Sequence, residues 1–175
     1  MRFPPSDDDI NEFRGASRTG DGNVISDFLY TFDADFHGKS EILEKSLRDA
    51  AFHGYPGIVS MILKSGADIN AGDDYGATAL IMASRKGLKH IVELLLQNGA
   101  DAHLQDYNRV TALMTARAYS HHDVIKLIED WPETQKQRTE NEQKKREQEK
   151  RAQSDARLDR LKQSGPPKLT LKRKP

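Results

Sequence analysis

The sequence predicts an all-α fold, an array of stacked helical hairpins followed by a charged tail. Ala50, Ala83 and Ala116 follow one another at intervals of 33 residues, and the Gly-Ala-Asp triplets at 66–68 and 99–101 keep the same interval. A fixed period of this size is typical of repeat proteins, whose units stack side by side. The two parts of the chain also carry net charges of opposite sign. Residues 1–132 hold 13 Lys and Arg against 20 Asp and Glu, a net charge of −7, and residues 133–175 hold 14 against 7, a net charge of +7.

The best-preserved unit, residues 73–98, has the signals of a turn followed by two helices. Residues 73–76 are rich in turn-forming types, and Thr78 is placed to cap a first helix that we expect over 79–86. Gly87 is suited to end that helix in the left-handed conformation. The second helix, expected from Lys89, has an apolar stripe suited to burial between layers: Ile91, Val92, Leu94, Leu95 and Leu96.

Four such units are expected within a repeat domain of residues 1–132, because one unit is too small to bury its own apolar face. Their approximate bounds are 8–36, 41–70, 74–103 and 107–132. The first and the last are interpreted as caps. The last unit has Glu129 where its predecessor has Leu96, which suits a polar outer face, and we expect Pro132 to end its second helix.

Two segments of the repeat region share a short signature, Thr78-Ala79-Leu80-Ile81-Met82-Ala83 and Thr111-Ala112-Leu113-Met114-Thr115-Ala116. They resemble the T-P-L-H-x-A segment of the ankyrin repeat, whose unit is a β-turn followed by two helices. Thr, Leu and Ala are kept, whereas Pro and His are replaced. The resemblance implies a solenoid of helix-turn-helix units with short β-turn tips. It also implies a reduced hydrogen-bond network, because Arg48, Ile81 and Met114 stand where the family has its His.

The same resemblance implies a non-enzymatic protein-protein interaction module. Such an adaptor or regulator would bind a protein partner through its concave face and turn tips. The usual contact positions of the family fall here on Phe52, His53, Asp74, Tyr75, Arg85, Lys86, Tyr107, Asn108 and Tyr119. Tyr and Arg are enriched among the residues that dominate binding energies, which supports a binding surface. An alternative stays open, in which the aromatic residues at the turns cover the neighbouring repeat.

The sequence offers no arrangement of residues suited to catalysis or to holding a metal or cofactor. It contains no cysteine, which excludes disulfides, thiolate metal sites and a cysteine nucleophile. The segment His121-His122-Asp123 is interpreted as part of a turn, because adjacent side chains on a helix diverge and no second cluster completes a tetrahedral site. No phosphate-binding glycine motif is present. We therefore expect no catalytic residue, no metal and no cofactor.

The location and the oligomeric state are predicted from the same composition. No apolar run is long enough to span a bilayer, so we expect no membrane association. We expect a cytoplasmic protein, with the nucleus as the alternative. A monomer is expected because only Leu158 and Leu161 in the tail suit the apolar positions of a coiled coil.

The tail, residues 133–175, is expected to be helical and solvated, or disordered. Residues 134–156 contain no Leu, Ile, Val, Phe, Tyr or Trp, so this stretch cannot join a packed core. It is nevertheless rich in Gln, Lys, Arg and Glu, which are good helix formers.

The tail also supplies a second functional hypothesis, that of a nucleic-acid- or ribosome-associated protein with Lys172, Arg173 and Lys174 as contact residues. This hypothesis is less favoured, because 7 carboxylates of the tail would face the phosphates and no aromatic residue is there to stack on bases. A tail that only keeps the chain in solution is the third interpretation left open.

Overall fold

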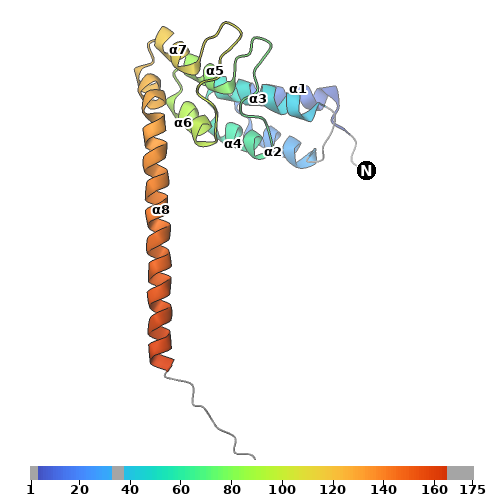
Figure 1. Cartoon of the computed structure of the whole chain (residues 1–175). Helices are drawn as coiled ribbons and strands as arrows, with labels where there is room; N and C mark the ends of the chain where they lie inside the picture. The colour runs from blue at the N-terminus through green and yellow to red at the C-terminus, as the bar shows by residue number, and fades with distance from the viewer. Residues whose placement is uncertain (1–3, 33–37, 165–175) are drawn as a thin grey trace, which may run out of the picture. The chain divides into compact units, whose positions relative to one another are not determined.

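The computed structural model describes residues 4–32 and 38–164, and all regular structure in these residues is helical (Figure 1). The prediction of an all-α fold is therefore confirmed. The helices are α1 (Asp7–Thr19), α2 (Gly22–Thr31), α3 (Lys39–His53), α4 (Pro56–Lys64), α5 (Ala79–Arg85), α6 (Lys89–Gln97), α7 (Ala112–Ala118) and α8 (His122–Ser164).

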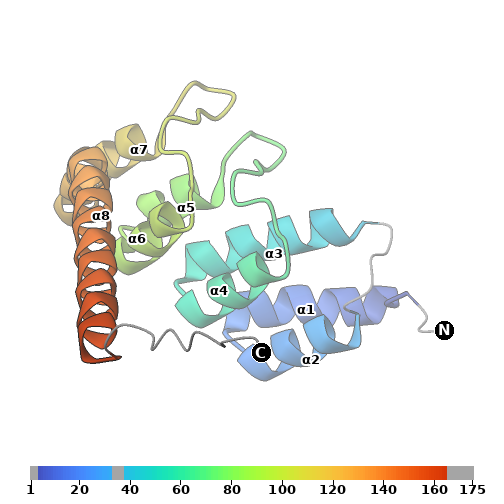
Figure 2. The same ribbon diagram turned by 60° about the horizontal axis from the view of Figure 1, so that its bottom comes forward.

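The helices up to α7 form two rows. In the inner row α1 contacts α3, α3 contacts α5, and α5 contacts α7, while α2, α4 and α6 form the outer row (Figure 2). Ala50, Ala83 and Ala116 lie in successive helices of the inner row and are fully buried. Their small side chains let neighbouring helices approach closely. The 33-residue period of the sequence is thus the step from one inner helix to the next.

Side-chain caps set the starts of three inner helices, α1, α5 and α7, whereas the N-cap of α3 is Gly38 without a side-chain hydrogen bond. Ser6 and Asp9 form a capping box on α1, in which the Ser6 Oγ accepts from the Asp9 N–H at 3.2 Å and the Ser6 N–H donates to Asp9 Oδ2 at 2.8 Å. Thr78 caps α5 by accepting from the Ile81 N–H at 3.4 Å, as predicted, and Thr111 accepts from the Met114 N–H at 3.2 Å.

Two turn tips precede α5 and α7, and each is built around one aspartate. Asp73 Oδ1 accepts from the backbone N–H groups of Tyr75 and Ala77 at 2.9 and 2.8 Å. Asp106 Oδ1 accepts from Asn108 and Val110 in the same way, both at 2.9 Å. The Tyr107 N–H also donates to the carbonyl of Tyr75 at 2.9 Å, so the two tips are joined through their backbones.

The inner helices differ in length. α5 and α7 have 7 residues each, whereas α1 has 13 and α3 has 15. The extra residues of α3 precede Lys45. In the following repeat, the corresponding positions form the turn tip before α5. The extra residues position two additional acidic side chains, Glu41 and Glu44, beside the first tip.

The chain divides into two compact units, Met1–Asp130 and Trp131–Pro175. Helix α8 begins in the first unit, where Val124 and Ile128 are buried, and continues through Pro132. The prediction that Pro132 ends the helix is wrong. A proline removes one helical hydrogen bond, but the residues that follow are strong helix formers and extend the helix to Ser164. Within the described residues, no helix has both the length and the apolar character needed to cross a membrane.

Candidate functional site

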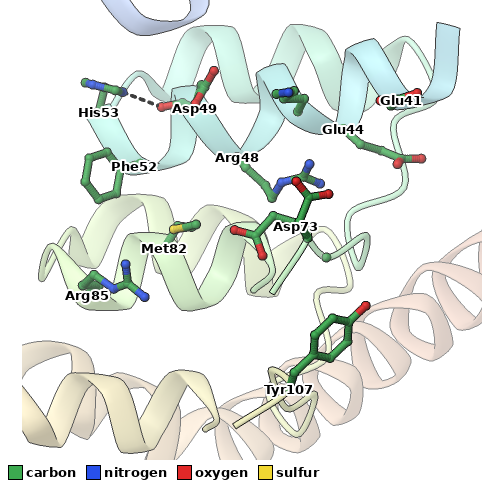
Figure 3. A pocket seen from close by; sticks show the side chains of 13 residues that line it. Glu41, Glu44, Arg48, Asp49, Phe52, His53, Asp73, Met82, Arg85 and Tyr107 are labelled. Atoms are coloured by element: carbon green, nitrogen blue, oxygen red, sulfur yellow. Dashed lines mark hydrogen bonds between the residues drawn. The ribbon is translucent and has the colours of Figure 1, made fainter. Parts of the chain in front are cut away.

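A groove of about 680 Å³ lies between α3 and α5 and is bounded by the two turn tips (Figure 3). Four segments of residues 1–130 form it: the exposed face of α3, the middle and end of α5, the loop before α5 and the loop before α7. Its lining residues are Glu41, Glu44, Lys45, Arg48, Asp49, Phe52, His53, Gly72, Asp73, Asp74, Met82, Arg85 and Tyr107.

Helical spacing explains why α3 supplies more than half of this lining. Residues 41, 45, 48 and 52 are separated by three or four positions and therefore share one face of the helix. Leu43, Leu47 and Ala50 lie on the other side and are buried in the core. Burial of this apolar side orients α3, so the charged side faces the groove.

The charged side chains of the groove are sorted along its length. Glu41, Glu44 and Asp73 lie toward one end, and Phe52, His53 and Arg85 lie toward the other (Figure 3). Arg48 lies between them with its guanidinium directed toward Asp73 (Figure 3), and its Nη1 donates to the carbonyl of Ala71 at 3.4 Å. Asp49 is already paired, since the Arg18 Nε lies 2.8 Å from its Oδ2.

The other end of the groove is built around the ring of Phe52, which is half-buried. The ammonium group of Lys86, the C-cap residue of α5, lies 4.3 Å from the centroid of this ring, a cation-π contact with α3. The His53 ring meets Phe52 edge-on at 5.2 Å, and His53 Nδ1 lies 2.8 Å from the carbonyl oxygen of Asp49. These contacts hold the Phe52 ring in place on the groove wall, where it presents apolar surface.

The structure brings together five of the predicted partner-binding residues, because Phe52, His53, Asp74, Arg85 and Tyr107 all line the groove. The other four lie outside this lining. Lys86 reaches it only through its contact with Phe52, and Tyr75 and Asn108 belong to the two tips. Tyr119 caps the C-terminal end of α7 and stacks on the ring of His121 at 6.2 Å. The predicted tail contacts Lys172, Arg173 and Lys174 lie outside the described residues.

The three tyrosines of this surface are largely exposed. The exposed fraction is 72% for Tyr75, 78% for Tyr107 and 56% for Tyr119. Tyr107 also covers part of the preceding tip, since a Cβ built on Gly76 would lie 2.8 Å from the Tyr107 ring. Tyr107 thus lies against its neighbouring tip and still presents most of its surface to solvent, and its contact with a partner stays a prediction.

The contact positions predicted from the sequence leave out seven charged or apolar residues of the groove: Glu41, Glu44, Lys45, Arg48, Asp49, Asp73 and Met82. Helical spacing in the sequence could have indicated most of these residues. Stepping back from Phe52 by helical spacing leads to Arg48, Lys45 and Glu41, and Met82 lies three residues before Arg85. The unusual length of α3, which no repeat signature marks, hid the contribution of Glu41 and Glu44.

In the segment 121–123, His121 makes a contact between two repeats. His121 Nε2 lies 3.0 Å from the carbonyl oxygen of Arg85, which links the last unit to the preceding one. Among residues 4–32 and 38–164, no group of three or more His, Cys, Asp or Glu side chains is placed to hold a metal ion.

Comparison with known proteins adds one finding. A family model described as ankyrin repeats in three copies matches residues 47–138, a range that begins within α3 and ends within α8. No curated protein matches the chain.

Proposed function

The chain belongs to the ankyrin-repeat family, and we propose that it is a non-enzymatic adaptor or regulator that binds a protein partner through the groove between α3 and α5. Ankyrin repeats generally mediate protein-protein interaction, and proteins built from them are typically without catalytic activity. The observation that carries the proposal is the groove itself, an open depression bordered by a mostly exposed tyrosine and lined by five residues at contact positions of the family.

The chemistry of the groove supports this role. Tyrosine and arginine are the residue types most often found among binding hot spots, and here Tyr107 and Arg85 border the same depression. Phe52 offers apolar surface at the end of the groove where Arg85 lies. A partner that covered this surface would exclude water from both aromatic rings, which is the arrangement that makes such residues contribute strongly.

The backbone around the groove is held in place before any partner arrives. The Asp73 and Asp106 side chains each accept two backbone hydrogen bonds within their tips, and the tips are bonded to each other. Binding therefore requires little ordering of the tips, and less conformational entropy is lost on association.

The proposal is tested with Arg85→Ala and Tyr107→Ala in the full chain. A partner captured from the native lysate is purified, and its affinity for each variant is measured by calorimetry. We expect each variant to weaken binding by about 1–3 kcal/mol, the range of a hot-spot residue. The thermal unfolding of each variant, followed by circular dichroism, should stay close to that of the unmodified chain.

The matched control is Tyr30→Ala, because Tyr30 is 77% exposed and lies on α2 in the outer row. Its removal should leave the affinity unchanged. Equal weakening by Tyr30→Ala, or full affinity in both groove variants, would place the binding surface elsewhere.

A further inference from the structure

The groove has a charge pattern that specifies its ligand more closely than its family does. Glu41, Glu44, Asp73 and Asp74 outnumber Lys45 and Arg48 in the part of the groove beside the tips, which we name the acidic end. At the other end Arg85 lines the groove beside Phe52, and Lys86 lies against the same ring. We name this part the basic end. The two ends are labelled in part in Figure 3, by Glu41, Glu44 and Asp73 on one side and Arg85 on the other.

Charges at both ends are available to a ligand. Within the described residues, the side chains of Asp74 and Arg85 make no hydrogen bond or ion pair, and both residues are exposed. Asp73 uses Oδ1 for the tip and Glu44 uses Oε1 to accept from the Ser40 hydroxyl, so each carboxylate keeps a second oxygen. A ligand with a cation toward the tips and an anion toward Arg85 would meet complementary charge at both ends.

The length of the groove suits a short stretch of extended peptide. Glu44 and Phe52 are eight residues apart on α3, which corresponds to about 12 Å at a helical rise of about 1.5 Å per residue. An extended peptide advances about 3.3 Å per residue, so about four residues cover the same distance. Phe52 and Met82 line the groove and offer apolar contact to a side chain near the basic end.

We propose that the groove binds an extended peptide segment that carries Lys or Arg at one end, an acidic residue about four positions away, and an apolar side chain between them. The inference rests on the proposed function, since it names the chemistry of the partner segment at that same site. Nucleic acid is disfavoured at this surface, because its phosphates would meet the four carboxylates of the acidic end.

The experiment uses the full chain and a fluorescent probe peptide, Lys-Lys-Ala-Leu-Ala-Glu-Glu, with fluorescence anisotropy as the readout. A control peptide of the same composition, Lys-Glu-Ala-Leu-Ala-Lys-Glu, has the charges interleaved. We expect the control to bind about tenfold more weakly than the probe, because it cannot place one sign of charge at each end. Binding of the probe should also weaken as salt is raised, since the charges are exposed.

Charge reversal identifies the two ends. Asp74→Lys should weaken probe binding about tenfold, and a peptide with Glu in place of both Lys residues should bind this variant better than it binds the unmodified chain. Arg85→Glu should act in the same way on the Glu residues of the probe. The matched control is Asp27→Lys, which changes the net charge equally on an exposed position of α2 and should leave probe binding unchanged.

Three results would overturn the proposal. These are equal binding of the two peptides, equal weakening by Asp27→Lys and Asp74→Lys, and displacement of the probe by an oligonucleotide. The proposed function is judged separately. A protein partner that is weakened by Arg85→Ala and Tyr107→Ala but binds Asp74→Lys normally would retain the function and refute the charge pattern. A partner indifferent to all three variants would refute both.

Discussion

Buried serines of the inner helices differ in whether their hydroxyl groups are satisfied. Ser17 donates to the carbonyl of Phe13 at 3.0 Å, whereas Ser46 Oγ and Ser84 Oγ are buried with no hydrogen-bond partner among the described residues. An unsatisfied buried hydroxyl lowers stability, because its hydration is lost without compensation.

Ser84→Ala is therefore expected to raise the free energy of unfolding by about 1 kcal/mol, since it removes a polar atom that has no partner. Ser17→Ala is the matched control and should lower the free energy of unfolding by about 1 kcal/mol, because it deletes a formed hydrogen bond. Urea denaturation of the full chain measures both. Changes of the same sign in the two variants would contradict the assignment of partners.

The capping box of α1 predicts a dependence on pH. The side-chain hydrogen bond from Ser6, followed by its backbone hydrogen bond, lowers the pKa of Asp9 below its usual value. A carboxyl group whose pKa is lower in the folded state adds stability above its unfolded pKa, and this contribution is lost as the pH falls through the folded pKa. The difference in unfolding midpoint between the unmodified chain and Asp9→Asn should thus be present at neutral pH and disappear in acid. A pH-independent difference would exclude this origin.

The helices of the inner row pack closely because small side chains occupy corresponding positions in them. Ala83 is fully buried in α5, which contacts α3 on one side and α7 on the other. Close approach on both sides leaves no room for a longer side chain, and protein interiors at this density resist added volume.

Ala83→Leu is expected to cost about 1–3 kcal/mol of unfolding free energy, because the added atoms must push apart two helix contacts. Ala118→Leu, on the exposed side of the neighbouring inner helix α7, should change stability by less than about 0.5 kcal/mol. Urea denaturation followed by circular dichroism distinguishes them. An unchanged free energy of unfolding in Ala83→Leu would mean that the inner row has room for a larger side chain at this position.

For the whole molecule, the division into two compact units has a consequence for stability. The apolar core, including Val124 and Ile128 at the start of α8, lies before residue 131, and the residues of the second unit whose exposure is described beyond 140 are all exposed. Repeat arrays derive their stability from interfaces between neighbouring repeats. We therefore expect residues 1–130 to keep their fold without the second unit.

Deletion of residues 133–175 should shift the unfolding free energy of the repeat unit by less than about 1 kcal/mol, a change expected when no core residue is removed. Circular dichroism during urea denaturation compares the truncated and full chains. The same pair of proteins tests the nucleic-acid hypothesis. Affinity for RNA that falls steeply with salt and vanishes on truncation would support a role of the tail.

The period, the Thr78 cap and the ankyrin-repeat family could be predicted from the sequence, because each depends on the residues within one repeat and the next. Thr78 caps its helix three residues away, and the alanine interval follows from the length of one unit. The bounds of the four units remain a prediction. Pro132 shows the limit of a local rule, because the strong helix formers that follow it continue the helix through the proline.

The set of residues that line the groove could not be predicted from the sequence, because it depends on how the repeats pack. Glu44 of α3, Asp74 of the first tip and Tyr107 of the second tip are separated by about a unit each along the chain, and stacking brings them to one depression. Their meeting depends on the length of α3 and on the hydrogen bond that joins the tips. The length of α3 belongs to one helix, whereas the hydrogen bond between the tips forms only when consecutive repeats stack.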